Sequence, residues 1–361
     1  MPDKPDISTR PLLIGGMHRS GTSLTASMFA DAGLNIGPTL LGAAPSNPMG
    51  HFEDVGFFNF HRRALVGQGL CSEGYTATVR GVVPPAFDAE ASGLVTARTR
   101  PGVAWGWKEP RTTLFLDFWQ DRIPDARHVF VFRRPWEVAD SLFRRGDDTF
   151  TINPVFALEV WTHYNRLILD FVHQHSDRCV VFEISQVIAD PYAVVAAVRE
   201  RFDIPLTAPH QCYVGSLFSR DDAPTRARLV QALAPEAWRT YLELRDLAGS
   251  DGDIDIRQRD RSLGECAVFE WARASRAEAL AREAEGRIRA EVDERVCRAA
   301  AERRRKRSPA NVVRRAATKL LAGLAAAARR LSQPERDASA DAPRLLPFPR
   351  AGEGPAAKRA A

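Results

Sequence analysis

The sequence predicts an α/β fold: a doubly wound, mostly parallel sheet with a P-loop-like phosphate-binding loop, followed by a C-terminal helical extension. Over the first part of the chain, short apolar segments of β-forming residues alternate with helical segments. The first apolar segment leads straight into a glycine-rich turn. From residue 262 onward the composition shifts to alanine, arginine and glutamate, and no further strand is indicated.

The predicted strands are short apolar runs, as expected of parallel strands that are covered on both faces. They comprise residues 10–16, 102–107, 127–133 and 178–184. The connecting residues 72–102 are rich in glycine, proline, alanine and threonine, so we expect them to form loops.

Helical segments are predicted between and after the strands. They comprise residues 22–32, 135–145, 154–175 and 191–202, and less regularly 205–250. Pro135 marks one helix start, and Asp190 and Pro191 supply the N-cap and first residue of another. We expect the helices of 205–250 to form the far wall of a cleft.

Cysteine spacing and apolar runs predict the compartment. The five cysteines form no C-x-x-C pair, which argues against a zinc knuckle or redox pair and favours free thiols. The N-terminal residues show no apolar signal-peptide region. No segment approaches the ~20 apolar residues of a membrane span. We therefore expect a cytoplasmic protein that holds no metal.

The formal net charge of +5 is unevenly distributed. Between Arg298 and Leu331 there are eleven Lys and Arg residues and a single acid, Glu302, so the first 297 residues are net acidic. The basic character therefore belongs to a C-terminal segment, and we expect no nucleic-acid binding by the main domain.

Three regions are predicted along the chain: an α/β domain over residues 1–260, a charged helical arm with coiled-coil character over 261–331, and a disordered tail over 332–361. The end of the arm has an apolar stripe opposite its Arg and Lys residues. Residues 303–331 are expected to contact a protein partner or, peripherally, the inner membrane face. Because alanine anchors weakly in a bilayer, the sequence favours the protein partner.

The stretch IGGMHRSGTSLTASMF, at the end of the first predicted strand, carries the first chemical signal. Gly16, Gly21 and Ser23 have the spacing of a nucleotide-triphosphate loop, but Thr22 stands where that loop has its lysine. A glycine-rich turn at a helix N-terminus directs backbone N–H groups and the helix dipole at one point. The pattern predicts an anion site whose cation, Arg19, lies inside the loop.

A second signal, HVFVFRRPWEVADSLFRR, runs from a strand into a helix. The strand ends at Arg133, and Ser141 lies about one and a half turns into the helix that Pro135 starts. The Ser141 hydroxyl can therefore point back toward the strand end. An arginine and a hydroxyl at that place would form a second phosphate site, about a nucleoside's width from the first.

Together the two motifs resemble those of sulfotransferases that use 3′-phosphoadenosine 5′-phosphosulfate (PAPS). That family has [KR]-S-G-T-[TS] after the first strand and R-x-P-x-[DE]-V-A-x-S after a later one; this chain has RSGTS at 19–23 and RRPWEVADS at 133–141. The later stretch VVFEISQVIADP is similar to the family's YEDL…DP, although Ile184 replaces the Asp. The resemblance covers about residues 10–205.

The resemblance implies a role for each motif residue. The residues that would hold the 5′-phosphosulfate are Arg19, Ser20, Gly21, Thr22 and Ser23. Arg133 and Ser141 would hold the 3′-phosphate, and a bidentate arginine there would discriminate this donor from ATP. Arg134 is expected to lie at the surface or behind the donor-binding residues rather than to contact the donor, and Arg220, in GSLFSR, is the candidate on the adenine side.

The resemblance also suggests the catalytic residues. Small-molecule members place a His after a Lys, but this chain reads WKEPR at 107–111. Glycan- and protein-modifying members use a Glu from an aromatic, acidic stretch, with a Lys before the Arg/Ser motif. Glu53 is therefore predicted to be the general base, and Lys108 the cation on the sulfuryl and bridging oxygens. Other candidates for the base are Asp54, His51 and Glu109.

The resemblance implies an enzyme that transfers a sulfuryl group from PAPS to an acceptor hydroxyl. The absent His and the candidate Glu favour a carbohydrate or other macromolecular acceptor. Arg111 is expected either to bind an anionic acceptor or to brace the strand end. The alternatives are a P-loop kinase that uses ATP, disfavoured by the missing lysine, and a catalytically inactive scaffold of the same fold.

Overall fold

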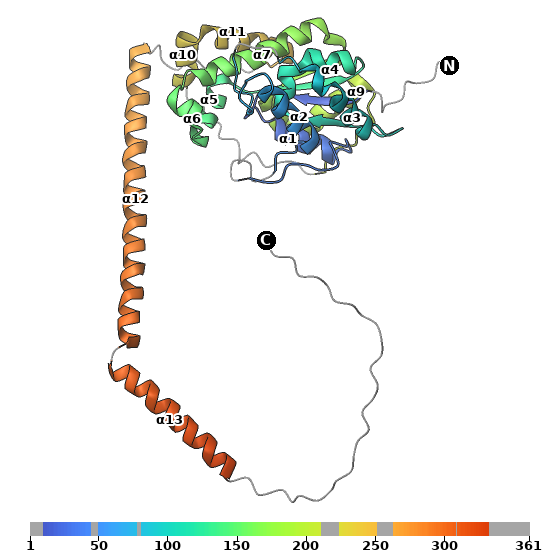
Figure 1. Ribbon diagram of the computed structural model, residues 1–361. Coiled ribbons are helices and arrows are strands. Elements are labelled where there is room, and N and C mark those ends of the chain that lie inside the picture. The colour runs from blue at the N-terminus through green and yellow to red at the C-terminus, as the bar shows by residue number, and fades with distance from the viewer. Residues whose placement is uncertain are drawn as a thin grey trace, which may run out of the picture. The chain divides into compact units, whose positions relative to one another are not determined.

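The structure, a computed structural model, describes residues 10–44, 50–77, 81–210, 224–250, 263–307 and 309–331 (Figure 1). Contacts within the chain divide it into two units, Met1–Ser275 and Arg276–Ala361. The sheet and the helices that pack on it belong to the first unit.

Four parallel strands form one sheet in the order β2-β1-β3-β4. They are β1 (Leu12–Gly15), β2 (Gly106–Lys108), β3 (Arg127–Phe132) and β4 (Cys179–Glu183). Strand β1 pairs with β2 and β3, and β3 also pairs with β4. The predicted parallel sheet is confirmed. Its second strand begins later than predicted, because Trp105 forms only an isolated bridge with Asn35.

Helices connect and surround these strands. The described helices of the first unit are α1 (Thr22–Asp31), α2 (Val55–Val66), α3 (Asp88–Arg98), α4 (Leu116–Arg122), α5 (Pro135–Arg145), α6 (Asp148–Ile152), α7 (Phe156–Gln174), α8 (Ile184–Ala189), α9 (Pro191–Phe202), α10 (Pro224–Leu233) and α11 (Pro235–Ala248), with the 3-10 helices η2 (Pro85–Phe87), η3 (Pro110–Phe115) and η4 (Ser176–Arg178). The helices predicted from Pro135 and Pro191 and those around residues 22–32 and 154–175 are confirmed. Of the predicted segment 205–250, α10 and α11 are helical, residues 205–210 are not, and residues 211–223 lie outside the described residues.

Side chains of the strands alternate between two apolar cores, one on each face of the sheet. On β3, Phe130 and Phe132 belong to one core, whereas Val129 and Val131 belong to the other. Helices α2, α4, α5, α7 and α11 complete the first core, and α1, α8 and α9 complete the second. Helices therefore cover both faces, which confirms the doubly wound prediction and explains why the strands are apolar throughout.

Several helices lie where none was predicted, among them α2 and α3. Helix α3 and η2 fall within residues 72–102, so the prediction of loops there is wrong for this part. Helix α3 has acidic residues in its first turn and Arg98 in its last turn, and these charges interact favourably with the helix dipole. The helix buries only Ala91, so its sequence shows a weak apolar pattern. Helix α2 begins at Val55, and the side chain of its N-cap, Asp54, accepts a hydrogen bond from the Gly56 amide.

The second unit begins within α12 (Leu263–Arg307) and continues with α13 (Pro309–Leu331). Both helices confirm the predicted helical extension. Among the described helices, none is long and apolar enough to cross a membrane. The predicted domain boundary at residue 260 and the predicted tail over 332–361 lie outside the described residues and stay predictions.

Candidate active site

The predicted site residues lie where the parallel strands end. Lys108 is the last residue of β2, and Arg133 directly follows β3. The glycine-rich loop follows β1, which lies between these two strands. The chain passes from β1 to β2 on one side and then crosses to β3 on the other. Open α/β sheets bind their ligands at such a reversal, outside the carboxyl ends of the strands.

The loop between β1 and α1 is held in a tight conformation. The Gly16 amide donates to Thr113 Oγ1 at 3.1 Å. Gly16 and Gly21 have φ angles of 145° and 94°, which glycine adopts readily. A Cβ at Gly16 would lie 2.3 Å from the Val131 carbonyl oxygen, and one at Gly21 would lie 2.2 Å from Ile184 Cδ1. Both positions therefore require glycine.

The loop holds an unsatisfied donor next to a helix N-terminus. Ser20 is fully buried, and its Oγ has no hydrogen-bond partner among the described residues. Helix α1 starts two residues later at Thr22, and its N-cap, Gly21, has no side chain to satisfy the first amides. Because a buried polar group without a partner is destabilising, this arrangement suits a bound anion.

Lys108 and Glu53, the two predicted catalytic residues, are in direct contact. Lys108 Nζ donates to Glu53 Oε1 at 2.6 Å, to Ser23 Oγ at 3.1 Å and to the His51 carbonyl at 3.1 Å. Lys108 and Glu53 are only 1% and 4% exposed, so water screens their ion pair little. The Ser23 hydroxyl also donates to the His51 carbonyl at 3.1 Å. This Lys108 cluster joins β2, α1 and the segment before α2.

The two predicted phosphate sites meet through Arg19. The sequence assigns Arg19 to the phosphosulfate and Ser141 to the 3′-phosphate, but Arg19 Nε donates directly to Ser141 Oγ at 2.9 Å. Arg133 Nε donates to Glu137 Oε2 at 2.7 Å. Burial, followed by the charges of Arg145 and Arg133, lowers the pKa of Arg19. The charges of two further arginines thus act on Arg19 beside the loop.

Asp54, one of the other candidates for the base, has a structural role in the architecture. It caps α2 through the Gly56 amide at 2.7 Å. Its carboxylate also receives Arg98 Nε at 2.9 Å and Arg98 Nη2 at 2.8 Å, a two-pronged ion pair that anchors α3 beside α2. With its acceptor positions occupied in this way, Asp54 is less suited than Glu53 to take a proton.

Glu109 is held in a separate buried network. Arg111 Nη1 donates to Glu109 Oε1 at 2.5 Å, and His61 Nδ1 lies 2.8 Å from Glu109 Oε2. Trp119 Nε1 donates to His61 Nε2 at 2.9 Å, which leaves the proton on the nitrogen that faces Glu109. Burial would raise the pKa of Glu109, but Arg111 and then His61 outweigh it and hold that pKa at about 2. A carboxylate with so low a pKa is a weak base.

The same network decides how Arg111 is placed. Besides Glu109, its guanidinium donates to Glu73 Oε2 at 2.9 Å and to the Ser72 carbonyl at 2.8 Å. Arg111 is 2% exposed and stays charged, because the carboxylate of Glu109 outweighs burial and raises its pKa. These contacts match the bracing role of the two that the sequence left open for this residue.

His18, the loop residue before Arg19, is absent from the sequence-based site. Its ring lies edge-on to Tyr75 and Tyr164, with ring centroids 5.8 Å and 6.2 Å away. His18 Nε2 is covered from solvent and has no hydrogen-bond partner in the described part of the chain. Burial, followed by the charge of Arg111, lowers the pKa of His18 well below its usual value, so the ring is neutral. Its position inside the loop motif is the signal that could have singled it out.

Arg145, in the last turn of α5, is a second residue that sequence analysis missed. After burial, its charge has the largest effect on the pKa of Arg19, which places it near the loop. Arg145 Nε pairs with Asp147 Oδ1 at 3.1 Å, and the Tyr75 hydroxyl donates to Asp147 Oδ2 at 3.0 Å. It lies four residues beyond Ser141, where the second motif ends, so only the fold reveals its proximity to the loop.

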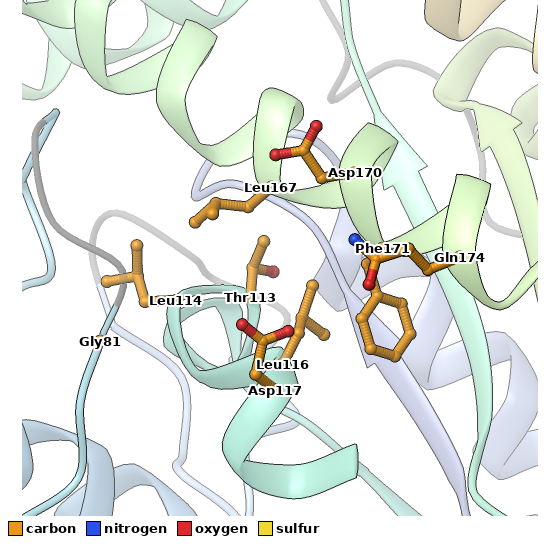
Figure 2. Close-up of a pocket in the computed structure, with 9 residues that line it drawn as sticks. All are labelled: Gly81, Thr113, Leu114, Leu116, Asp117, Leu167, Asp170, Phe171 and Gln174. Carbon is orange, nitrogen blue, oxygen red and sulfur yellow. The ribbon is translucent and has the colours of Figure 1, made fainter. Parts of the chain in front are cut away.

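A small pocket lies between η3, α4 and α7 (Figure 2). Two carboxylates, Asp117 and Asp170, and the Thr113 side chain are among its lining groups. Its volume of about 20 Å³ holds about one water molecule. The pocket is therefore too small for a nucleotide, and the predicted site residues are not among those that line it.

The remaining predicted residues have simpler environments. Arg134 Nε lies 3.4 Å from Glu183 Oε1, and Glu183 also accepts from the Tyr241 hydroxyl at 3.2 Å. Arg220 lies outside the described residues. Among the described residues, no group of three or more His, Cys, Asp or Glu side chains could hold a metal ion.

The part of the chain that contains the sheet, the loop and the Lys108 cluster matches a known family. A sequence model of the Sulfotransferase family matches residues 11–208. The chain belongs to the sulfotransferase family. A comparison with curated protein sequences gives no match.

Solved sulfotransferase structures are similar to this sulfotransferase at low identity. The Alicyclobacillus acidocaldarius sulfotransferase is 15% identical, with 67% of this chain and 97% of that chain covered and a TM-score of 0.42. A Mycobacterium avium sulfotransferase is 15% identical, with 71% and 74% covered and a TM-score of 0.42. The sulfotransferase domain of a Synechococcus olefin synthase is 21% identical, with 67% and 94% covered and a TM-score of 0.38.

Glu109→Gln is expected to lower the free energy of unfolding by roughly 3–5 kcal/mol, because Arg111 would lose its buried counter-charge. The pKa of Glu109, about 2, lies below its ordinary 4.5. The ionised network therefore stabilises the fold above pH 4.5, and this contribution is lost as the pH falls toward 2. Urea unfolding at several pH values should show a steeper acid loss for the wild type than for the variant.

Glu159→Gln, at an exposed position of α7, is the matched control and should keep the wild-type pH profile. Identical acid slopes for the wild type and Glu109→Gln would contradict the assignment of this network.

Proposed function

We propose that this sulfotransferase moves the sulfuryl group of PAPS to an acceptor hydroxyl, on a carbohydrate or another macromolecule. The observation that supports this most is the buried ion pair of Lys108 and Glu53 at 2.6 Å, linked through Lys108 to Ser23 at the end of the loop. It puts a carboxylate that can take a proton and an ammonium that can neutralise charge beside an anion site.

The residues present fit the charged ends of the donor. The Ser20 hydroxyl, unpaired among the described residues, and the first amides of α1 suit the 5′-phosphosulfate. Arg133 and Ser141 suit the 3′-phosphate. Arg19, bonded to Ser141, is placed to contact either group. When bound, PAPS supplies the activated sulfuryl group, whose bond to the 5′-phosphate oxygen breaks on transfer.

Glu53 is the proposed general base. An acceptor hydroxyl next to its carboxylate would give up its proton as the hydroxyl oxygen attacks sulfur. Lys108 would offset the negative charge that develops on the sulfuryl and bridging oxygens. Because Lys108 also donates to Ser23 and to the His51 carbonyl, its ammonium is oriented by three acceptors before any substrate binds.

An ATP-dependent kinase finds less support at this site. The residue after Gly21 is Thr22, which is 3% exposed. The Thr22 methyl lies against the start of the loop, 2.8 Å from where a Cβ on Gly16 would be. A triphosphate loop uses a lysine at that position on its β- and γ-phosphates, whereas the lysine of this site comes from β2.

His18 completes the proposed donor site. Its Nε2 and Ser20 Oγ are two covered polar atoms of one loop, neither with a partner among the described residues. Leaving such an atom unpaired costs roughly 1–3 kcal/mol. A bound substrate that supplied the partner would recover this cost. The neutral imidazole can donate or accept at Nε2, according to its tautomer.

Arg133→Ala is expected to weaken binding of the product nucleotide, adenosine 3′,5′-bisphosphate, by roughly tenfold to a hundredfold, through the loss of charge-assisted hydrogen bonds. Arg133→Lys should recover only part of this affinity, since it keeps the charge but not the planar fork. Calorimetric titration measures both. Arg166→Ala, half-exposed on α7, is the control and should bind as the wild type does. Wild-type protein that bound ATP equally well would overturn the PAPS proposal.

Glu53→Gln is expected to lower kcat by about 10²–10⁴, because the acceptor would lose its base, while the affinity for adenosine 3′,5′-bisphosphate stays unchanged. Transfer of labelled sulfate from PAPS to the polysaccharide fraction of a cell extract measures the rate. A thermal melt checks that the variant is folded, since Lys108 loses its counter-charge. Retained activity in folded Glu53→Gln would exclude Glu53 as the base.

His18→Phe keeps a flat ring against Tyr75 and Tyr164 but removes both nitrogens. We expect an unchanged or higher melting temperature, because an unpaired polar atom is removed, and about tenfold weaker binding of adenosine 3′,5′-bisphosphate. His173→Phe, at an exposed position of α7, should change neither quantity. A lower melting temperature with unchanged affinity would mean that His18 only supports the fold.

A further inference from the structure

Helix α13 separates apolar and basic side chains onto opposite sides. At about 100° per residue, Val313, Leu320 and Leu324 lie within about 40° of one another. Arg315, Lys319 and Arg329 lie on the opposite side of the same helical wheel. We call the first group the aliphatic side of α13 and the second its basic side.

The aliphatic side is open to solvent in the structure. Val313, Leu320 and Leu324 are 67%, 69% and 59% exposed. Three large aliphatic side chains in one row, each mostly exposed, are more than the scattered apolar residues of an ordinary surface. Such a row indicates a surface that binds an apolar partner.

The charge around this row is of one sign. Residues 303–331 contain ten Lys and Arg residues and no Asp or Glu. Any occupant must therefore combine an apolar layer with a negative one. The interface of a bilayer with anionic lipids presents these two layers in that order, with hydrocarbon below and phosphate groups above.

We propose that α13 binds along the surface of a bilayer that contains anionic lipids, with its aliphatic side among the upper acyl chains and its basic side at the phosphate groups. The row is completed by small residues, Ala317 and Ala327, which would fill the holes of a coiled-coil partner poorly. A lipid interface needs no such complementary shape. Attraction between the basic residues and anionic lipid offsets the weak anchoring of alanine, which reverses the preference drawn from sequence alone.

The test uses the full chain and extruded vesicles of phosphatidylcholine, with or without phosphatidylglycerol. Co-sedimentation should show binding to the phosphatidylglycerol vesicles that weakens as salt rises, and little binding to phosphatidylcholine alone. Binding that did not depend on phosphatidylglycerol, or no binding at all, would overturn the proposal.

Two double variants that leave the net charge unchanged distinguish insertion of the aliphatic side into the bilayer from attraction between the basic residues and anionic lipids alone. Leu320→Gln with Leu324→Gln changes the aliphatic side, and Ala322→Gln with Ala326→Gln changes the basic side by the same residue type. The first pair should lose about tenfold or more in vesicle affinity, whereas the second should stay near the wild type. Equal losses in the two variants would overturn the insertion of the aliphatic side.

A measurement of self-association tests whether a second copy of the chain, rather than a bilayer, binds the aliphatic side. Analytical ultracentrifugation of the wild type without vesicles should show no oligomer that depends on Leu320 and Leu324. An oligomer that the leucine variant abolished, together with unchanged vesicle binding by that variant, would assign the aliphatic side to a second copy of the chain and overturn the proposal.

Discussion

The ammonium of Lys108 is the group around which the candidate site is arranged. A charge that is 1% exposed must find its partners inside the protein, since leaving it unpaired would be strongly destabilising. Its three acceptors come from the start of α1 and from the segment before α2. Strand β2 sets where the ammonium lies, because Gly106 packs so tightly on β1 that a Cβ would be 1.8 Å from the Leu12 carbonyl oxygen.

At the end of the same strand, two adjacent residues, Lys108 and Glu109, have different roles. Glu109 has extended backbone angles, φ −157° and ψ 118°, so its side chain points away from that of Lys108. Lys108 joins the group next to the loop, and Glu109 anchors Arg111 and His61 in the interior. Two adjacent buried charged residues thus serve different networks, and Glu109 fixes the strand end from which Lys108 extends.

The loop combines tight packing with unsatisfied polar atoms. Its glycines approach Val131 and Ile184 closely, whereas Ser20 Oγ and His18 Nε2 are covered and lack partners among the described residues. An element optimised for stability alone would pair or replace such atoms. Their presence where several arginines converge is the kind of local cost that proteins retain at binding sites.

By itself, the sequence determined the parallel strands, the loop, and Arg133 and Ser141 as candidates, because apolar runs and motif spacing are local properties. Glu53 and Lys108 became candidates only through the family resemblance. It did not reveal α3, whose one buried side chain leaves almost no helical pattern. Only the tertiary structure decided which charged groups meet. Arg19 and Ser141 are 122 residues apart and Glu53 and Lys108 are 55 apart, yet both pairs are in hydrogen-bond contact. Those contacts, like the position of His18 between two tyrosines, depend on strand register and helix packing, which no local pattern encodes.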